Sequence, residues 1–449
     1  MRRHFLAFPK KTVFFPKKKT KKIMGKGAEQ TLKEEEVLID GRLIDVSGFK
    51  HPGGSVLKQF KNKGDATAAF REFHARSKKA AKVLKGLPQR PASAEDMKTR
   101  CRRPELTADF EKLRSELISE GYFEPSRGEI FYQLSEIVIF HVVAVYLIKC
   151  TTYFFCGLLL LATATGRCGQ VNHEAGHYSL TGSVKIDGII ADICNGIGCG
   201  LSGGWWRNMH SKHHATPQKL GHDVDLDTLP LLAFNDKVLQ GKKTTWLKYQ
   251  AILFAPVSCL LVALFWQLFL HPRYAILTKK YFELFCMFIR YPLIFGFVLK
   301  DLSLPKALMA YLLYDQLGAA YVFINNAMSH THKPVTNADE DLHWVEYAAN
   351  HTTNITPGPI ANWWMHDLNM QIEHHLFPSM PEFRHKFIVP RVKALFDKHG
   401  LHYDVRPYFT VLKATFDNLH HVGNHDEKDH KVQVKNEPLE GKNKGKKFN

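Results

Sequence analysis

Long apolar runs occupy the middle of the chain, and charged segments occupy both ends. A helix needs about 20 apolar residues to cross a bilayer. Five runs approach that length: 130–148, 153–165, 251–270, 282–299 and 304–323. The second reaches it only if it extends from about Cys150 to Gly166, and the fourth is the poorest because Glu283, Arg290 and Pro292 interrupt it. The pattern therefore predicts several membrane-crossing helices.

The first 128 residues are polar and carry shorter patterns. Two short apolar runs within 37–46 are separated by Asp40-Gly41, which predicts a β-hairpin. Helical spacing of apolar residues follows to about residue 88, and a charged amphipathic helix is predicted over 105–121. Residues 1–33 and 416–449 are rich in charge, so we expect a disordered basic arm and a disordered tail.

The formal net charge is +18, a balance that is also typical of nucleic-acid-binding proteins. Here the basic residues gather in the leading arm and in the C-terminal tail, away from any helix-turn-helix, finger or RNA-binding motif. In a chain with membrane helices, such flanks mark the cytosolic side and contact anionic lipids. The sequence therefore disfavours nucleic acid as a partner.

The eight cysteines form no CxxC pair, which argues against disulfides and thiolate zinc sites.

A pair of histidines in the N-terminal region has the spacing of a haem site. His51 opens the turn His51-Pro-Gly-Gly54, and His74 follows twenty-three residues later. Two neutral imidazoles can clamp a haem iron axially and give a centre that carries single electrons. The apolar side chains between them can wall the pocket: Val56, Leu57, Phe60 and Phe70. The whole frame, including Gly64-Asp-Ala-Thr67, resembles cytochrome b5, and in that resemblance His51 and His74 are the haem ligands.

Three further histidine clusters lie beside the apolar runs. They are His173-Glu-Ala-Gly-His177, His210-Ser-Lys-His-His214 and Gln371-Ile-Glu-His-His375. Residues three and four apart share one face of a helix, so each cluster presents ligand groups toward one point. Imidazole binds zinc, copper, iron or nickel. Seven histidines and a glutamine exceed the needs of one ion, so the clusters predict two metal ions.

The positions of these clusters restrict the number of membrane crossings. All three must meet at one site, so an even number of crossings separates the second from the third. We therefore expect 251–270 and 304–323 to cross and 282–299 to lie in the interface or re-enter. The segment between the first two clusters contains Asp187 and Asp192 and is not expected to cross. Four spans result, with both termini on one face.

The first cluster also fits the HExxH pattern of zinc proteases, with Glu174 as the general base. That interpretation leaves the other two clusters and the haem pair unexplained, so the sequence favours it less.

Taken together, the three histidine boxes, the b5-like module and the glutamine that opens the third box resemble the front-end fatty acid desaturases. These enzymes insert a double bond between an existing one and the carboxyl end of an acyl chain. The resemblance runs from about residue 35 to 415 and includes Gly203-Gly-Trp-Trp206, His222-Asp-Val-Asp-Leu-Asp227 and Asn369 to Pro378. Around 170–235 the chain is most similar to delta-5 enzymes, with delta-6 enzymes next.

The resemblance implies a site residue by residue. The iron ligands are His173, His177, His210, His213, His214, His374 and His375, with Gln371 where other desaturases have a histidine. The family adds a ligand after the last span, where this chain has Ser329-His-Thr-His332; we expect His332 to be that ligand and rank His330 second. Asp223, Asp225, Asp227, Glu174 and Glu373 are candidates to orient the imidazoles.

The implied architecture is an α+β cytochrome b5-like domain over 34–95, a linker and amphipathic helix over 96–128, and an all-α four-span domain with a cytosolic cap over 129–415. The implied cofactors are two iron ions and a b-type haem, with O2 as co-substrate and NADH used through an external cytochrome b5 reductase. The expected location is the endoplasmic reticulum membrane, with both termini cytosolic; Lys446-Lys-Phe-Asn449 resembles a dilysine retrieval signal.

Three alternatives share parts of this pattern. A sphingolipid long-chain-base desaturase has the same b5 fusion and Gln box, and an acyl hydroxylase uses the same di-iron frame. A haem-binding membrane adaptor without catalysis would hold haem and no further metal.

Overall fold

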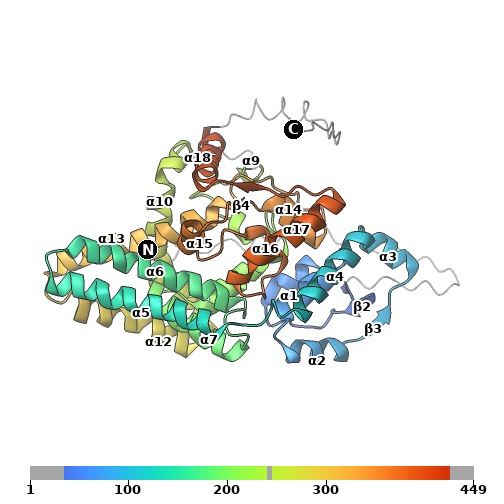
Figure 1. Ribbon diagram of the computed structural model, residues 1–449, viewed down its shortest axis with the longest axis horizontal. Coiled ribbons are helices and arrows are strands. Elements are labelled where there is room, and N and C mark those ends of the chain that lie inside the picture. Colours follow the sequence, from blue (N-terminus) through green and yellow to red (C-terminus); the bar gives the residue numbers. More distant parts are fainter. Residues whose placement is uncertain (1–34, 240–244, 425–449) are drawn as a thin grey trace, which may run out of the picture.

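The computed structural model describes residues 35–239 and 245–424. The predicted basic arm at 1–33 and the dilysine-like end lie outside these residues. Figure 1 shows a bundle of long helices at one end of the molecule and a cap of shorter helices and two small sheets at the other. The cap carries the candidate chemistry, and the bundle positions it.

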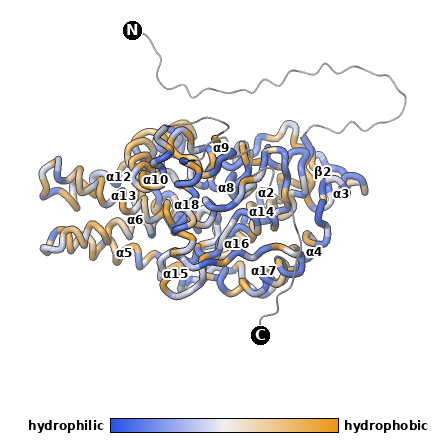
Figure 2. Tube along the Cα trace, turned by 90° about the horizontal axis from the view of Figure 1, so that it is seen from above, coloured by the Kyte–Doolittle hydropathy of each residue, from blue (hydrophilic) through white to orange (hydrophobic). Residues whose placement is uncertain are grey.

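Four helices of the bundle are long and apolar enough to cross a membrane. They are α5 (Arg127–Cys150), α6 (Phe154–Gly176), α12 (Tyr281–Leu293) continued by the π-helical η6 (Ile294–Val298), and α13 (Leu304–Met328). Hydrophobic residues dominate these helices in Figure 2. Large apolar side chains on α5 and α13 face outward, among them Phe131, Val142 and Met309. An exposed apolar surface of this kind fits lipid, and the chain is a membrane protein.

The structure has four candidate spans, or five if the bent segment at 247–277 also crosses, and the run at 282–299 is one of the four. The segment at 282–299, which we expected in the interface, forms a candidate span, because its charged residues are paired inside the protein. The Arg290 guanidinium lies 2.8 Å from the Asp315 carboxylate of α13, and both side chains are buried. Lys280 lies 2.5 Å from Glu283. Pairing removes most of the cost that made this run look unsuitable.

The segment at 251–270, which we expected to cross, is bent instead. It comprises η4 (Leu247–Tyr249), α10 (Gln250–Leu260), η5 (Leu261–Leu270) and α11 (His271–Leu277), and its two arms meet at 53°. Pro256 lies inside α10, where it removes a backbone donor and crowds the preceding turn. A segment bent in this way is either a broken span or a re-entrant segment. The even number of crossings between the second and third boxes requires the re-entrant form, because α12 with η6 and α13 already supply two candidate spans.

The N-terminal module is a small α+β unit. Strands β1 (Glu36–Ile39) and β2 (Arg42–Asp45) form the predicted hairpin, and Asp40 and Gly41 adopt positive φ in its two-residue turn. Strand β3 (Gln89–Pro91) completes the sheet beside β2. The remaining elements are η1 (Gly54–Gln59), α1 (Thr67–His74), α2 (Lys78–Gly86) and α3 (Ala94–Arg100).

Helix α4 (Pro104–Ser119) confirms the predicted amphipathic helix and joins the module to the cap. Its apolar face buries Leu106, Phe110 and Leu117 against cap residues that include Phe377 and Phe396. Ala68 and Ala69 of α1 belong to the same cluster. The module and the cap therefore share one hydrophobic core.

The rest of the cap follows the bundle helices along the chain. The elements between α6 and the bent segment at 247–277 are α7 (Val184–Ile193), the π-helical η2 (Cys194–Gly198), α8 (Gly203–Ala215), η3 (Val224–Leu226) and α9 (Asp236–Leu239). After α13 come α14 (Trp344–His351), β4 (Asn354–Ile355), α15 (Pro359–Met365), α16 (Gln371–Leu376), η7 (Glu382–Arg384), α17 (His385–His399), β5 (Val405–Arg406) and α18 (Tyr408–Asn424).

Helix α18 corrects the predicted start of the tail at residue 416. Leu419 is fully buried and packs near Phe254, and its carbonyl accepts a hydrogen bond from Gln250 at 2.8 Å. Val422 is buried in a neighbouring cluster with Leu247. These contacts order the chain to residue 424.

Candidate metal centre

Five histidines from all three boxes converge at the junction of the bundle and the cap. The C-terminal end of α6 supplies His173 and brings His177, α8 supplies His210 and His214, and α16 supplies His374. One ring nitrogen of each lies within 4.8 Å of the others. The Nε2 atoms of His214 and His210 are 3.0 Å apart, and those of His374 and His214 are 3.1 Å apart. The predicted meeting of the three boxes is present in the fold.

A second group lies beside the first and consists of His213, His330 and His375. His330 follows α13, and its Nε2 is 3.2 Å from Nε2 of His375. His332, which we expected to supply the additional ligand, lies elsewhere: its Nε2 is 3.1 Å from the Thr353 hydroxyl, and it belongs to neither imidazole group among the described residues. The chain leaves α13 in a tight turn, so residues 330 and 332 point in different directions.

Hydrogen bonds to Nδ1 atoms turn several imidazoles toward the shared space. His213 Nδ1 lies 3.0 Å from the Asp223 carboxylate and 3.3 Å from that of Asp225. His330 Nδ1 donates to the backbone carbonyl of His351 at 2.8 Å. A proton held on Nδ1 leaves the Nε2 lone pair free for a metal.

His173 is oriented by a residue that the sequence analysis missed. Its Nδ1 lies 2.6 Å from Oε1 of Glu382 in η7, and Glu382 is buried. Glu382 is separated from box three by Pro378 and Pro381 and belongs to no motif in the sequence. Only the fold brings it to the first box.

The remaining acidic candidates have other partners. Glu174 accepts hydrogen bonds from the Gln133 amide at 3.0 Å and from the Glu382 backbone at 3.1 Å. Glu373 accepts from Asn354 at 2.7 Å and from the Tyr403 hydroxyl at 2.6 Å, and burial raises its pKa to about 7.

The hydrogen bonds of Asp227 and Gln371 within the described residues do not include an imidazole of the site. Asp227 is exposed at the end of η3. Gln371 is buried at the start of α16, and its amide donates to the Leu368 carbonyl at 3.0 Å. Gln371 therefore anchors the helix that carries His374 and His375.

The donor set fits metal ions. Nitrogen ligands lie about 2 Å from a first-row metal, so two ligands of one ion are at most about 4 Å apart. The ligand atoms within each group lie within 4.8 Å of one another, so some pairs must approach by several tenths of an ångström to share an ion. His177 Nε2 and the Nδ1 atoms of His214, His374 and His375 are buried without a hydrogen-bond partner among the described residues. Buried polar atoms are rarely left without a partner, and a bound ion would give His177 Nε2 one. The Nδ1 atoms belong to rings whose Nε2 atoms face the shared space, so an ion there does not account for them.

The charge state of the imidazoles also bears on metal binding. Burial and the neighbouring His213 lower the pKa of His330 to about 3, so it is neutral at pH 7 as a ligand must be. Burial disfavours the charged form of His213 as well, but the Asp223 and Asp225 carboxylates outweigh this and raise its pKa to about 9. Metal binding at His213 therefore releases a proton.

The two histidines of the N-terminal module also face each other. The ring centroids of His51 and His74 are 5.8 Å apart at an interplanar angle of 90°. His74 Nδ1 lies 3.0 Å from the Phe70 carbonyl, which leaves its Nε2 free for iron. His51 Nδ1 accepts from the Gly53 amide at 3.0 Å, so ligation through Nε2 requires that this contact open and the proton move to Nδ1. Burial lowers the pKa of both rings.

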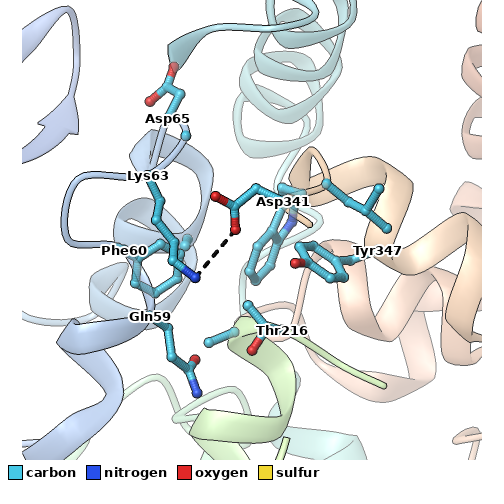
Figure 3. Close-up of a pocket in the computed structure, with 12 residues that line it drawn as sticks. Gln59, Phe60, Lys63, Asp65, Thr216, Asp341 and Tyr347 are labelled. Atoms are coloured by element: carbon cyan, nitrogen blue, oxygen red, sulfur yellow. Dashed lines mark ion pairs between the residues drawn. The ribbon is translucent and has the colours of Figure 1, made fainter. Parts of the chain in front are cut away.

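The module docks directly against the helix that carries box two. Asn208 of α8 donates to the Gly53 carbonyl at 3.0 Å, two residues before His210. The Gln59 amide donates to the His222 carbonyl at 3.1 Å, next to Asp223. Figure 3 shows the seam between the two parts, where Lys63 lies 3.5 Å from Asp341. The turn after His51 is thus in contact with the helix that carries box two.

A membrane bundle with three histidine boxes joined at its cap is the arrangement expected of a membrane oxidoreductase. The fatty acid desaturase family model matches residues 150–407, and the chain belongs to that family. It is therefore an oxidoreductase that desaturates fatty acyl chains, and the zinc-protease and adaptor interpretations are set aside.

Curated relatives cover most of the chain. An "Acyl-lipid (8-3)-desaturase" from Rebecca salina is 51% identical over 401 residues, which are 88% of this chain and 93% of the relative. A protein of the same name from Thraustochytrium sp is 47% identical over 408 residues, 87% of this chain and 93% of the relative. The human "Fatty acid desaturase 3" is 27% identical over 84% of this chain and 87% of its own length. The resemblance to the front-end desaturases is thereby confirmed.

Proposed function

We propose that this chain is a front-end polyunsaturated fatty acyl desaturase that inserts a cis double bond with two irons, O2 and electrons from its own b-type haem. Delta-5 regiochemistry is favoured and delta-6 is next. The observation that carries the proposal is the convergence of eight histidines into two adjacent groups, one of five and one of three. Two adjacent groups fit a pair of ions better than a single ion.

Removal of hydrogen from an unactivated methylene is beyond the reach of side-chain acids and bases. When bound, the two irons supply O2-dependent oxidation of such a methylene, and the haem supplies electrons one at a time. The protein contributes positioning. His173, His177, His210, His214 and His374 hold one ion, and His213, His330 and His375 hold the other. Glu382, Asp223 and the His351 carbonyl fix the imidazoles that they contact.

Residues 34–95 serve as the cytochrome b5-like haem domain, residues 96–128 connect it, and the desaturase domain begins near residue 129. The contacts of Gly53 with Asn208 and of Gln59 with His222 support this division of labour, because they join the haem-ligand turn to the box-two segment. Cytochrome b5 reductase, using NADH, is the expected external donor.

The substrate is an acyl chain carried by a membrane lipid. Two relatives at 51% and 47% identity are named as acyl-lipid desaturases, which supports a lipid carrier over acyl-CoA. The proposed location is the endoplasmic reticulum membrane with cytosolic termini. The apolar bundle and the cap at one end of it are consistent with that orientation.

Expression in yeast supplied with defined polyunsaturated acids tests the function. The expected product has one additional double bond on the carboxyl side of an existing one, located by mass spectrometry of derivatised acids. His213→Ala should abolish the product, whereas Asp227→Asn, at an exposed site of the same region, should keep it. A hydroxylated acid or a desaturated sphingoid base in place of this product would refute the proposal.

A further inference from the structure

A cavity with several charged side chains in its wall opens near the metal centre, and the proposed reaction does not yet use it. It has a volume of about 590 Å³ and lies between the first turns of α5, the middle of α6 and the segment that contains α15. A hydrogen bond of 2.7 Å from the Trp363 indole to the Glu136 carboxylate joins α15 to α5 at its edge. Figure 2 shows α15 beside α5 where the helix meets the cap.

The cavity lies where the candidate spans α5 and α6 adjoin the cap. Phe131 of α5 is 73% exposed and Ile360 of α15 is 82% exposed, so apolar side chains flank it on both sides. Trp363 lines the cavity and is partly exposed, as is typical of tryptophans at the membrane interface. A molecule can therefore reach it sideways from the bilayer.

Two buried polar groups line this cavity with donors left over. Arg167 is 1% exposed; its Nε lies 3.1 Å from Glu136, and its guanidinium stacks on Trp363 at 4.6 Å. Its Nη2 has no hydrogen-bond partner within the described part of the chain, and neither has Nε2 of His366, which is 9% exposed. A buried arginine donor without a partner is costly, so a ligand oxygen at this position would be stabilising.

The backbone at His366 adds an independent sign of a constrained site. His366 and Asp367 both have φ of 58°, a left-handed conformation that costs a non-glycine residue energy. This conformation turns His366 toward Glu382 and Glu174, with which its ring nitrogen forms a cluster. Glu382 in turn contacts His173. The Glu382 side chain thus lies between His366 in the cavity wall and the proposed metal ligand His173.

The charges of the lining indicate the kind of headgroup. Three carboxylates and two cations line the cavity, and ion pairs join Arg167 to Glu136 at 3.1 Å and Lys386 to Asp367 at 3.4 Å. Glu129 is the third carboxylate. A coenzyme A group carries several phosphates and would meet repulsion from the carboxylates. A zwitterionic headgroup carries one phosphate and one ammonium, and this mixed lining matches both.

We propose that this cavity binds the ester and zwitterionic headgroup of a membrane glycerophospholipid, the carrier of the acyl chain to be desaturated. The proposal rests on the proposed function, since a front-end reaction needs the ester only a few carbons from the metal. The headgroup enters between Lys386 and Asp367 and opens their ion pair, so that Lys386 contacts the phosphate and Asp367, together with Glu129, contacts the ammonium. The free Nη2 of Arg167 donates to the ester carbonyl.

Fluorescence quenching in detergent tests this without turnover. Full-length protein in a non-ionic detergent is titrated with phosphatidylcholine brominated near the carbonyl, and the Trp363 signal is taken as the difference from Trp363→Phe. Saturable quenching is expected. Lys386→Glu should weaken it about fivefold, the order of one lost ion pair at the surface. Lys393→Glu is the matched control, because Lys393 is exposed on the same helix and outside the cavity.

Equal quenching in the Lys386 and Lys393 variants would overturn the proposal. So would displacement of the brominated lipid by oleoyl-CoA at lower concentration than by unlabelled phosphatidylcholine. Brominated phosphatidylglycerol, which lacks the ammonium, should bind more weakly, and equal binding would contradict the assigned role of the carboxylates. Because iron and product formation are not involved, failure here is separate from failure of the desaturase activity.

Discussion

Asp223 is the residue through which the orientation of one metal ligand can be tested most cleanly. Its Oδ2 accepts from His213 Nδ1 at 3.0 Å and from the Gln218 backbone at 2.7 Å, and its Oδ1 accepts from the Asp225 backbone at 2.9 Å. In Asp223→Asn, one flip of the amide keeps the oxygen toward His213 and Gln218. The NH2 group then faces the Asp225 amide, so one hydrogen bond and the negative charge are lost.

The loss of metal affinity in Asp223→Asn should lie at the lower end of the range usual for such substitutions. Loss of a group that orients a metal ligand weakens metal binding by about 10–100-fold. Since His213 retains a neutral acceptor, we expect about tenfold for the ion held by His213, His330 and His375, which is about 1.4 kcal/mol. The ion held by the other five histidines should be unaffected.

A chelator titration of the iron-loaded protein measures this directly. Iron release should occur in two phases, and Asp223→Asn should shift one of them by about tenfold in chelator concentration. Asp227→Asn is the matched control, because Asp227 is exposed and belongs to neither imidazole group nor the acidic group around His213 in the described chain. Identical titrations for the two variants would refute the assignment of Asp223, and an equal shift in both phases would refute the division into two groups.

Three further outcomes are expected. His330→Ala should lose one iron and all product, whereas His332→Ala should retain both; metal analysis and fatty-acid profiles check this, and the reverse pattern would contradict the geometry. Arg290→Met should destabilise the protein by about 3–5 kcal/mol by stranding Asp315, and Asp315→Leu in the same chain should restore most of the loss in thermal unfolding. The metal-free protein should lose stability as pH falls from 6.5 toward 4. Burial lowers the pKa of His343 to about 4, so in this range the unfolded chain binds a proton that the folded chain does not. Each such histidine contributes a slope of about 1.4 kcal/mol per pH unit, and a melting temperature that rises toward pH 5 would contradict this.

Local patterns in the sequence were sufficient for much of the fold. The Asp40-Gly41 hairpin and the amphipathic helix ending at Ser119 follow from short-range turn and spacing rules, and the structure has both. The meeting of the three boxes was expected from the spacing of their ligand groups, and the parity of the crossings was deduced from it; the fold brings the boxes together.

Long-range pairing explains where the prediction was wrong. Arg290 counted against a span because its partner, Asp315, lies on a different helix and is invisible to a hydropathy pattern. Pro256 lies within the apolar run at 251–270, which we expected to cross and which is bent by 53° in the structure. A charge inside a membrane helix is therefore informative only when its partner is known.

The same reason accounts for the residues missed at the site. Glu382 contacts His173 although the two residues are more than two hundred positions apart in the sequence, and Glu382 belongs to no local motif. His330 and His332 are two residues apart, so only the geometry of the turn after Met328 distinguishes them. Composition and spacing identified the boxes, and tertiary contacts identified their supports.

The central claim is that the three boxes hold a pair of irons. Metal analysis of purified full-length protein, with haem determined separately from its spectrum, tests it most directly. The account predicts two non-haem irons per chain, one for each imidazole group, with loss of iron in His213→Ala. A protein that is fully folded and contains haem, but binds one non-haem iron or none after reconstitution, would contradict it.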